Sequence, residues 1–165
     1  MRISTRGRYG LRAMVELARH AGDGPLLMRA ITERQGIPRK YLHAILTALR
    51  SRGLVRSLRG SRGGYALGRP PEEITALDII RALEGDIVLV DCAEHGELCG
   101  RNRTCATRAL WLELSRTIER QLAGVTLAEL GRRGRPDGKP GRRAAPRKAS
   151  PRGKEKAHGA DLPRP

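Results

Sequence analysis

The chain lacks phenylalanine, and aromatic residues make up only 2% of its 165 residues. Leu, Ile, Val and Ala must therefore build the core, which favours helices packed through aliphatic faces. No apolar run approaches the roughly 20 residues that a membrane span needs. Met1 is followed by the charged stretch RISTRGRYG rather than by an apolar segment, so we expect no secretory signal and a cytoplasmic protein. The length allows one compact domain or two small ones that share a core.

Cysteine is also scarce, and all three cysteines lie in the segment DCAEHGELCGRNRTCATR, at Cys92, Cys99 and Cys105. An odd number of cysteines without an export signal argues against a disulfide framework and for metal binding or redox chemistry. The segment offers almost no apolar neighbours, so these are not core cysteines. Their thiolates suit zinc or an iron–sulfur cluster. Structural zinc commonly uses cysteines two to four residues apart, and this wider spacing fits a larger cluster without deciding between the metals.

Acidic residues are few at both ends of the chain, which has a formal net charge of +16. Residues 1–69 hold 15 basic and 3 acidic side chains, residues 70–130 hold 6 and 11, and residues 131–165 hold 12 and 3. The sequence is therefore basic, then acidic, then basic. An anionic partner is the first expectation, and nucleic acid is the main candidate.

The hydrophobic spacing predicts a fold that is mainly α with a small β wing. Helices are expected over residues 5–20, 26–36, 38–53, 73–85 and 105–124, and strands over 54–58 and 65–67 around a Gly-rich turn. In the first helix the polar side is expected to hold Arg6, Arg8, Arg12, Glu16 and Arg19. Helix, turn, helix and hairpin follow one another in the order of a winged helix-turn-helix.

The predicted helix over residues 105–124 places apolar residues four apart, at Leu110, Leu114, Ile118 and Leu122. Such a stripe needs a second surface, and the same helix of another subunit would supply it, giving a homodimer. This interpretation divides the chain into a DNA-binding domain (1–85), a cysteine-containing cluster loop (86–104), a long C-terminal dimerisation helix with its turn (105–131) and a disordered basic tail (132–165). The tail would aid solubility or attract phosphate weakly.

Residues 38–52 have the features of a helix that reads the major groove of double-stranded DNA. Polar side chains stand near its start, and Leu42, Ile45, Leu46 and Leu49 form the opposite face. The predicted DNA-contacting residues are Arg39, Lys40, Tyr41, His43 and, in the wing turn, Arg59 and Arg62. The alternative is an ordinary solvated charged face, but the absence of acids there weakens it. A dimer would bind two-fold related half-sites about 10 base pairs apart, or a multiple of that.

Several stretches together resemble the IscR/NsrR/RirA family of winged-helix transcription regulators, also called the Rrf-two family. They are MRISTRGRYGLRAM, RQGIPRKYL, GLVRSLRGSRGGYALG, the three cysteines followed by a Trp, and VTLAEL. The N-terminus is most like the IscR branch. The resemblance implies a homodimeric bacterial repressor or activator, with an iron–sulfur cluster on the three cysteines and with Lys40, Tyr41, His43 and Arg59 near bases or phosphates.

The chain departs from this family at the fourth cluster ligand. The IscR branch has a histidine three residues after the last cysteine, where this chain has Arg108, and the nitric-oxide-sensing branch has an acid near position 8, where this chain has Arg8. His95 is the nearest imidazole and a candidate fourth ligand, with Glu94 or Glu97 as oxygen donors, unless His95 is simply a solvated loop residue. A 2Fe–2S cluster is favoured, and a 4Fe–4S cluster stays open.

Two other functions compete with a cluster-sensing regulator. In the first, the same winged-helix regulator uses its cysteines as zinc ligands or as a thiol redox switch. In the second, the chain is an enzyme with a cysteine nucleophile. The scattered histidines argue against the enzyme, because such catalysis needs a base beside the thiol.

Overall fold

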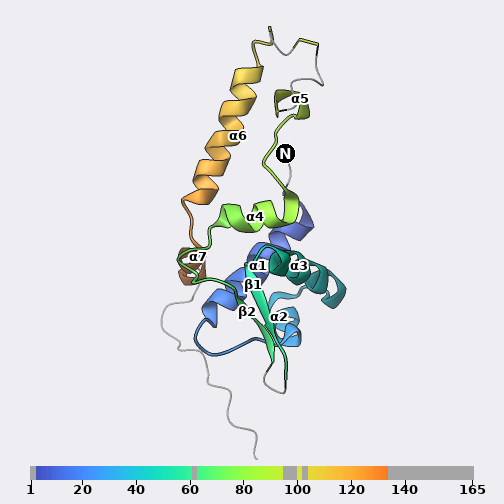
Figure 1. The fold of residues 1–165 in the computed structure, drawn as a ribbon, viewed down its shortest axis with the longest axis vertical. Helices are drawn as coiled ribbons and strands as arrows, with labels where there is room; N and C mark the ends of the chain where they lie inside the picture. Colours follow the sequence, from blue (N-terminus) through green and yellow to red (C-terminus); the bar gives the residue numbers. More distant parts are fainter. Residues whose placement is uncertain (1–2, 61–62, 95–99, 102–103, 134–165) are drawn as a thin grey trace, which may run out of the picture. The chain divides into compact units, whose positions relative to one another are not determined.

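The computed structural model describes residues 3–60, 63–94, 100–101 and 104–133. Its elements, in chain order, are α1 (Thr5–Arg19), α2 (Met28–Gln35), α3 (Arg39–Ser51), β1 (Val55–Leu58), β2 (Gly64–Leu67), α4 (Ala76–Glu84), α5 (Asp91–Glu94), α6 (Arg108–Ala123) and α7 (Leu127–Arg132) (Figure 1). The predicted winged helix-turn-helix with a small β wing and a following long helix is confirmed. The predicted tail lies outside the described residues from 134 onward.

Aliphatic side chains of α1, α3 and α4 form the core, as the lack of phenylalanine requires. Met14, Leu46 and Ile79 are fully buried at its centre. The helices approach closely at Gly10 of α1, where an added Cβ would clash with the side chain of Leu83 on α4. Each large aliphatic side chain buried here stabilises the fold by about 1.5–3 kcal/mol. One face of α3 therefore packs on the main core.

The wing is an antiparallel hairpin in which Val55 pairs with Leu67 and Leu58 pairs with Gly64. Leu26 forms a single β-bridge with Tyr65 of β2, because the two backbones exchange two hydrogen bonds of 2.8 Å. Gly64 is required at this point, since its φ is +152° and an added Cβ would lie 2.5 Å from the Leu26 carbonyl oxygen. The hairpin is thus tied to the segment before α2.

The prediction that Glu16 lies on the solvent side of the first helix is wrong, because only 4% of this residue is exposed. Arg34 Nη1 of α2 donates to Glu16 Oε1 at 3.0 Å, and Gln35 Nε2 donates to Oε2 at 2.7 Å. The Nδ1 atom of His20 lies 3.5 Å from Glu16 Oε1. These partners replace the water that a buried carboxylate loses. Glu16 therefore fixes α2 against α1.

The helix α7, which the periodicity did not predict, closes the same core. Leu127 is fully buried, and Arg19 of α1 donates to the backbone carbonyls of Gly131 and Arg133. Thr126 caps the helix by accepting from the backbone N–H of Glu129. The end of the predicted dimerisation segment thus packs on α1, next to the DNA-binding elements.

The predicted cluster loop contains the single helical turn α5, which packs on α6 (Figure 1). Arg81 of α4 donates to Glu119 of α6 over 2.7 Å, so α6 is also joined to α4. Among the described helices, none has the length and apolar character needed to cross a membrane.

Candidate nucleic-acid interface and cysteine site

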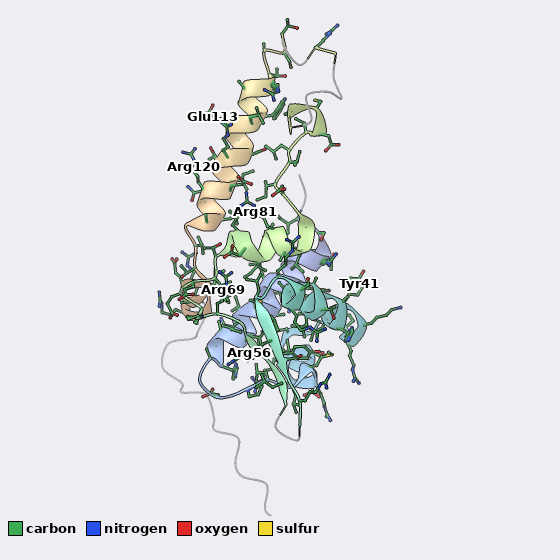
Figure 2. The ribbon with its side chains drawn as sticks, viewed as in Figure 1. Tyr41, Arg56, Arg69, Arg81, Glu113 and Arg120 are labelled. Atoms are coloured by element: carbon green, nitrogen blue, oxygen red, sulfur yellow. The ribbon has the colours of Figure 1, made fainter. Side chains whose placement is uncertain are left out.

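Helix α3 divides cleanly into a buried face and an exposed face. The buried face consists of Leu42, Ile45, Leu46 and Leu49. The exposed residues include every predicted contact residue of this helix, namely Arg39, Lys40, Tyr41 and His43. Tyr41 is 53% exposed despite its size, and Figure 2 shows it on α3 away from the wing. The polar half of α3 is therefore free to meet a partner.

The first turn of α3 places cations where the helix dipole disfavours them. Its N-cap is Pro38, which supplies no side-chain hydrogen bond, and the first turn contains no acid. Arg39 and Lys40 face the partial positive charge of the unpaired N–H groups, an arrangement that costs a few tenths to about 1 kcal/mol per cation. An anion bound at this end of α3 would make the local electrostatic energy favourable, because the anion would be attracted both by the helix dipole and by the two cations.

The hairpin contributes further exposed cations. Arg56 on β1 is exposed (Figure 2), as is Arg59 in the turn. Arg50 at the end of α3 donates to Ser57 of β1 over 3.3 Å. Arg62 lies outside the described residues. Between residues 34 and 71 the sequence has no acidic residue. The α3–hairpin region is therefore uniformly basic and lacks internal counterions.

Two residues that the sequence did not single out support Tyr41. The rings of Tyr9 and Tyr41 meet edge to face, with centroids 6.2 Å apart and an interplanar angle of 88°. The guanidinium of Arg12 lies 5.7 Å from the centroid of the Tyr9 ring and also hydrogen-bonds the side chain and carbonyl of Gln35. Edge-to-face pairs and cation–π contacts are each worth about 0.5–1.5 kcal/mol. Together they restrict the orientation of Tyr41.

The model of the Rrf2 family, described as an iron-dependent transcriptional regulator, matches residues 3–133. This chain belongs to the Rrf2 family of transcriptional regulators. The regulator CymR of Bacillus subtilis is 42% identical over 130 residues, covering 79% of this chain and 89% of that protein. IscR of Aliivibrio salmonicida is 41% identical over 131 residues, covering 79% of this chain and 77% of that protein.

Solved structures of Rrf2 relatives agree with this fold. The structure of CymR, the global cysteine regulator of B. subtilis, matches with a TM-score of 0.70 at 40% identity, covering 79% of this chain and 96% of that one. The oxidized form of Staphylococcus aureus CymR matches with a TM-score of 0.66 at 37% identity, covering 80% and 97%. Because the relatives are transcriptional regulators and not enzymes, the cysteine-nucleophile hypothesis is excluded.

In this Rrf2 regulator, two of the three cysteines lie within the described residues. Cys92 is an exposed residue of α5, and Cys105 is half-buried three residues before α6. Cys99, His95 and Glu97 lie outside the described residues, as does the side chain of Glu94. Among the described side chains, no group of three or more metal-binding residues comes together. Cys92 lies in α5, which packs on α6, and Cys105 lies just before α6.

Cys105 has an environment that favours the thiolate. Its Sγ lies 3.4 Å from Oγ1 of Thr107, and this hydroxyl is the main cause that lowers the pKa of Cys105. The backbone N–H groups of Thr107 and Arg108 and the charge of Arg108 lower the pKa further, while burial acts in the opposite direction. A thiolate is the form that binds a soft metal or reacts with an oxidant. The environment of Cys105 therefore suits a cysteine that binds a metal or one that is oxidised.

The apolar stripe predicted on α6 is covered only at one end. Ile118 and Leu122 pack against Leu77, Ile80 and Ile87. Leu110 and Leu114 are 50% and 40% exposed. No residue of α6 is fully buried. The half of α6 that is nearer to the cysteines thus presents an apolar surface that the described residues leave open.

Proposed function

We propose that this Rrf2 regulator binds double-stranded DNA as a homodimer and that an iron–sulfur cluster on Cys92, Cys99 and Cys105 sets its DNA affinity. The observation that carries the DNA-binding proposal is the exposed, acid-free basic surface of α3 and the hairpin. Helix α3 enters the major groove, and the hairpin lies along the backbone or in the adjacent minor groove.

The contact residues follow from exposure and position. Tyr41 and His43 stand on the exposed face of α3 within reach of base edges, and Arg39 and Lys40 neutralise phosphates at its start. In the wing, Arg59 and Arg62 approach the minor groove or the backbone, where narrow grooves attract arginine. Phosphate contacts set affinity and register, whereas the base contacts set the operator sequence.

The dimer is proposed from the open end of the α6 stripe. Leu110 and Leu114 would be covered by the same residues of a second subunit around a two-fold axis. A two-fold dimer presents two copies of α3 to successive major grooves. The operator is then expected to have two related half-sites about 10 base pairs apart, or a multiple of that.

The cluster is proposed from the cysteine chemistry and the family description as an iron-dependent regulator. When bound, a cluster supplies a link between thiolates that responds to iron, oxidants or nitric oxide. The protein's own part is positional, because α5, which contains the exposed Cys92, packs on α6, and Cys105 lies three residues before α6. His95 is the proposed fourth ligand, with Glu94 or Glu97 as the alternative oxygen donors.

A second candidate keeps the DNA-binding half and replaces the cluster by a thiol switch or a zinc site. It is favoured by the similarity to CymR, of which an oxidized form has been solved, and by the lowered pKa of Cys105. In this version Cys105 is oxidised first, because the thiolate is the reactive species.

The first experiment is an ultraviolet–visible spectrum with iron, sulfide and zinc analysis on protein purified without oxygen. Visible absorbance with iron and sulfide supports the cluster. A colourless protein that stays free of iron after reconstitution contradicts it, and DNA binding that follows thiol oxidation would then favour the switch. Equal DNA affinity of the loaded protein and of a triple Cys→Ala variant, at one salt concentration, would refute control by the cysteines.

The DNA interface is tested by the salt dependence of binding to a random-sequence duplex. Lys40→Ala and Arg59→Ala should weaken binding and each reduce the slope of log K against log salt by about 1, because one phosphate contact is lost. Arg116→Ala, which removes an exposed cation on α6, is the matched control and should leave the slope unchanged. Slopes that fall equally in all three variants would contradict a local interface on α3 and the wing.

A further inference from the structure

Tyr41 is an exposed aromatic side chain on α3 that meets a side chain of another helix. Because 53% of Tyr41 is exposed, several rotamers are open to it unless a neighbour restricts them. Tyr9, on α1, is that neighbour, and the two rings meet edge to face with centroids 6.2 Å apart and an interplanar angle of 88°. A T-shaped pair is favourable only while the edge of one ring faces the other. The contact therefore favours one orientation of the Tyr41 ring.

Tyr9 is itself fixed by its neighbours. It is half-buried and packs on the main core, and the guanidinium of Arg12 lies 5.7 Å from the centroid of its ring. Arg12 donates from Nε to Oε1 of Gln35 over 3.3 Å and from Nη2 to the Gln35 carbonyl. Gln35 in turn donates to the buried carboxylate of Glu16 over 2.7 Å. A continuous line of contacts thus runs from the packing of α1 on α2 to Tyr41.

Arg12 differs from the cations that are proposed to meet phosphates. Its guanidinium is engaged by Gln35 and by the Tyr9 ring. Lys40 and Arg59, by contrast, are exposed and make no side-chain hydrogen bond or ion pair within the described part of the chain. The geometry of Arg12 therefore favours a role in holding the Tyr9 ring over a role in neutralising a phosphate.

We infer that Tyr9 and Arg12 are positioning residues that set the sequence specificity of DNA binding, because they hold Tyr41 in the orientation that meets base edges, an inference that rests on the proposed contact of Tyr41 with bases. A side chain that is already held in its binding orientation loses less conformational entropy when the complex forms. This gain is realised only where Tyr41 meets a favourable base edge. It therefore raises the affinity for the preferred sequence over the affinity for other duplexes.

The test uses the full-length protein and a duplex that the wild-type protein selects from a randomised library. The specificity ratio is the affinity for this duplex divided by the affinity for a random-sequence duplex at the same salt concentration. Tyr9→Leu removes the ring and Arg12→Leu removes the cation, and each should lower the specificity ratio by about 2–10-fold, the size expected for one aromatic or cation–π contact. Tyr9→Phe keeps the edge-to-face pair and should keep the wild-type ratio. Val15→Ala, which trims another half-buried side chain of α1 on the main core, is the control and should also keep it.

Action through Tyr41 is tested by a double-mutant cycle. Tyr41→Ala should lower the specificity ratio, and adding Tyr9→Leu to that variant should lower it no further. A second drop of full size would show that Tyr9 acts independently of Tyr41 and would overturn the inference. Arg12→Leu should leave the slope of log K against log salt on the random-sequence duplex unchanged. A slope reduced by about 1 would make Arg12 a phosphate contact and overturn its positioning role.

The outcomes separate this inference from the proposed function. A wild-type protein that binds no duplex overturns the proposed DNA binding. A specificity ratio that is unchanged in Tyr41→Ala overturns the proposed base contact and this inference with it. A ratio that falls in Tyr41→Ala but stays at the wild-type value in Tyr9→Leu and Arg12→Leu overturns only the positioning role. If circular dichroism shows that Tyr9→Leu does not fold, Arg12→Leu at its exposed position decides the question alone.

Discussion

The carboxylate of Glu84, at the end of α4, caps the N-terminus of α1. It accepts from the backbone N–H of Gly7 at 2.9 Å and from that of Ser4 at 3.2 Å, and it also accepts from the Ser4 hydroxyl. Ser4 in turn caps α1 by accepting from the backbone N–H of Arg6. Glu84 therefore satisfies donors that the helix leaves unpaired and places a negative charge at the positive end of the dipole.

The cost of Glu84→Ala follows from these contacts. Loss of a helix cap costs about 0.5–2 kcal/mol, and the exposure of Glu84 and Ser4 screens the charge term. The Ser4 cap remains in the variant, so we expect a loss of about 1–2 kcal/mol in the free energy of unfolding. Glu84→Gln keeps a neutral acceptor and should lose about half as much. At about 4 °C per kcal/mol, Glu84→Ala should lower the melting temperature by about 4–8 °C.

The assay is thermal and urea unfolding of the metal-free protein, followed by far-ultraviolet circular dichroism. Glu72→Ala is the control, because Glu72 is exposed and makes no side-chain hydrogen bond or ion pair within the described part of the chain. A Glu84→Ala protein as stable as the Glu72→Ala protein would refute the capping argument. A loss larger than about 4 kcal/mol would also contradict it, since exposed contacts of this kind are too weak to produce it.

Three further substitutions test other contacts. Leu46→Ala should cost about 2–5 kcal/mol in urea unfolding, because Leu46 is fully buried behind α3. Thr107→Val should raise the pKa of Cys105, so the pH midpoint for its alkylation by iodoacetamide in metal-free protein should move upward, and an unchanged midpoint by mass spectrometry would contradict the hydroxyl contact. Leu114→Glu should shift the protein toward monomer in sedimentation velocity, whereas a dimer unaffected at the same concentration would place the interface elsewhere.

The sequence was sufficient to predict the helices and strands of the winged helix, because their hydrophobic period is strong. It was not sufficient to place Glu16, since the charged partners that make its burial tolerable come from α2 and not from its own helix. The same holds for Arg12 and Tyr9, whose contacts with Gln35 and Tyr41 depend on tertiary packing. The helix α7 had a local sequence signal, because Thr126 followed by Glu129 is a capping pattern. However, α7 has only six residues, which are too few to show a helical period.

The apolar stripe on α6 shows that residue spacing alone does not predict which part of a stripe packs within its own chain. Residues four apart on an α-helix turn by about 40° relative to one another, because the helix has about 3.6 residues per turn. Ile118 and Leu122 pack against Leu77, Ile80 and Ile87, while Leu110 and Leu114, in the half of α6 nearer to the cysteines, stay exposed. The full stripe was predicted to face another subunit, but the structure leaves only its first half for that role.

In the proposed function, a chain of contacts joins the cysteines to α3. Cys105 leads into α6, whose Glu119 is bound by Arg81 of α4, and the last turn of α4 holds the start of α1 through Glu84. Helix α1 then packs directly on α3 in the core. A coupling of about 1–3 kcal/mol between cysteine state and DNA would change affinity about 5–150-fold, and its lower end matches the loss of about 1–2 kcal/mol expected when the Glu84 cap is removed. In the proposed function, changing a single one of these contacts, without rebuilding the core, would change operator affinity.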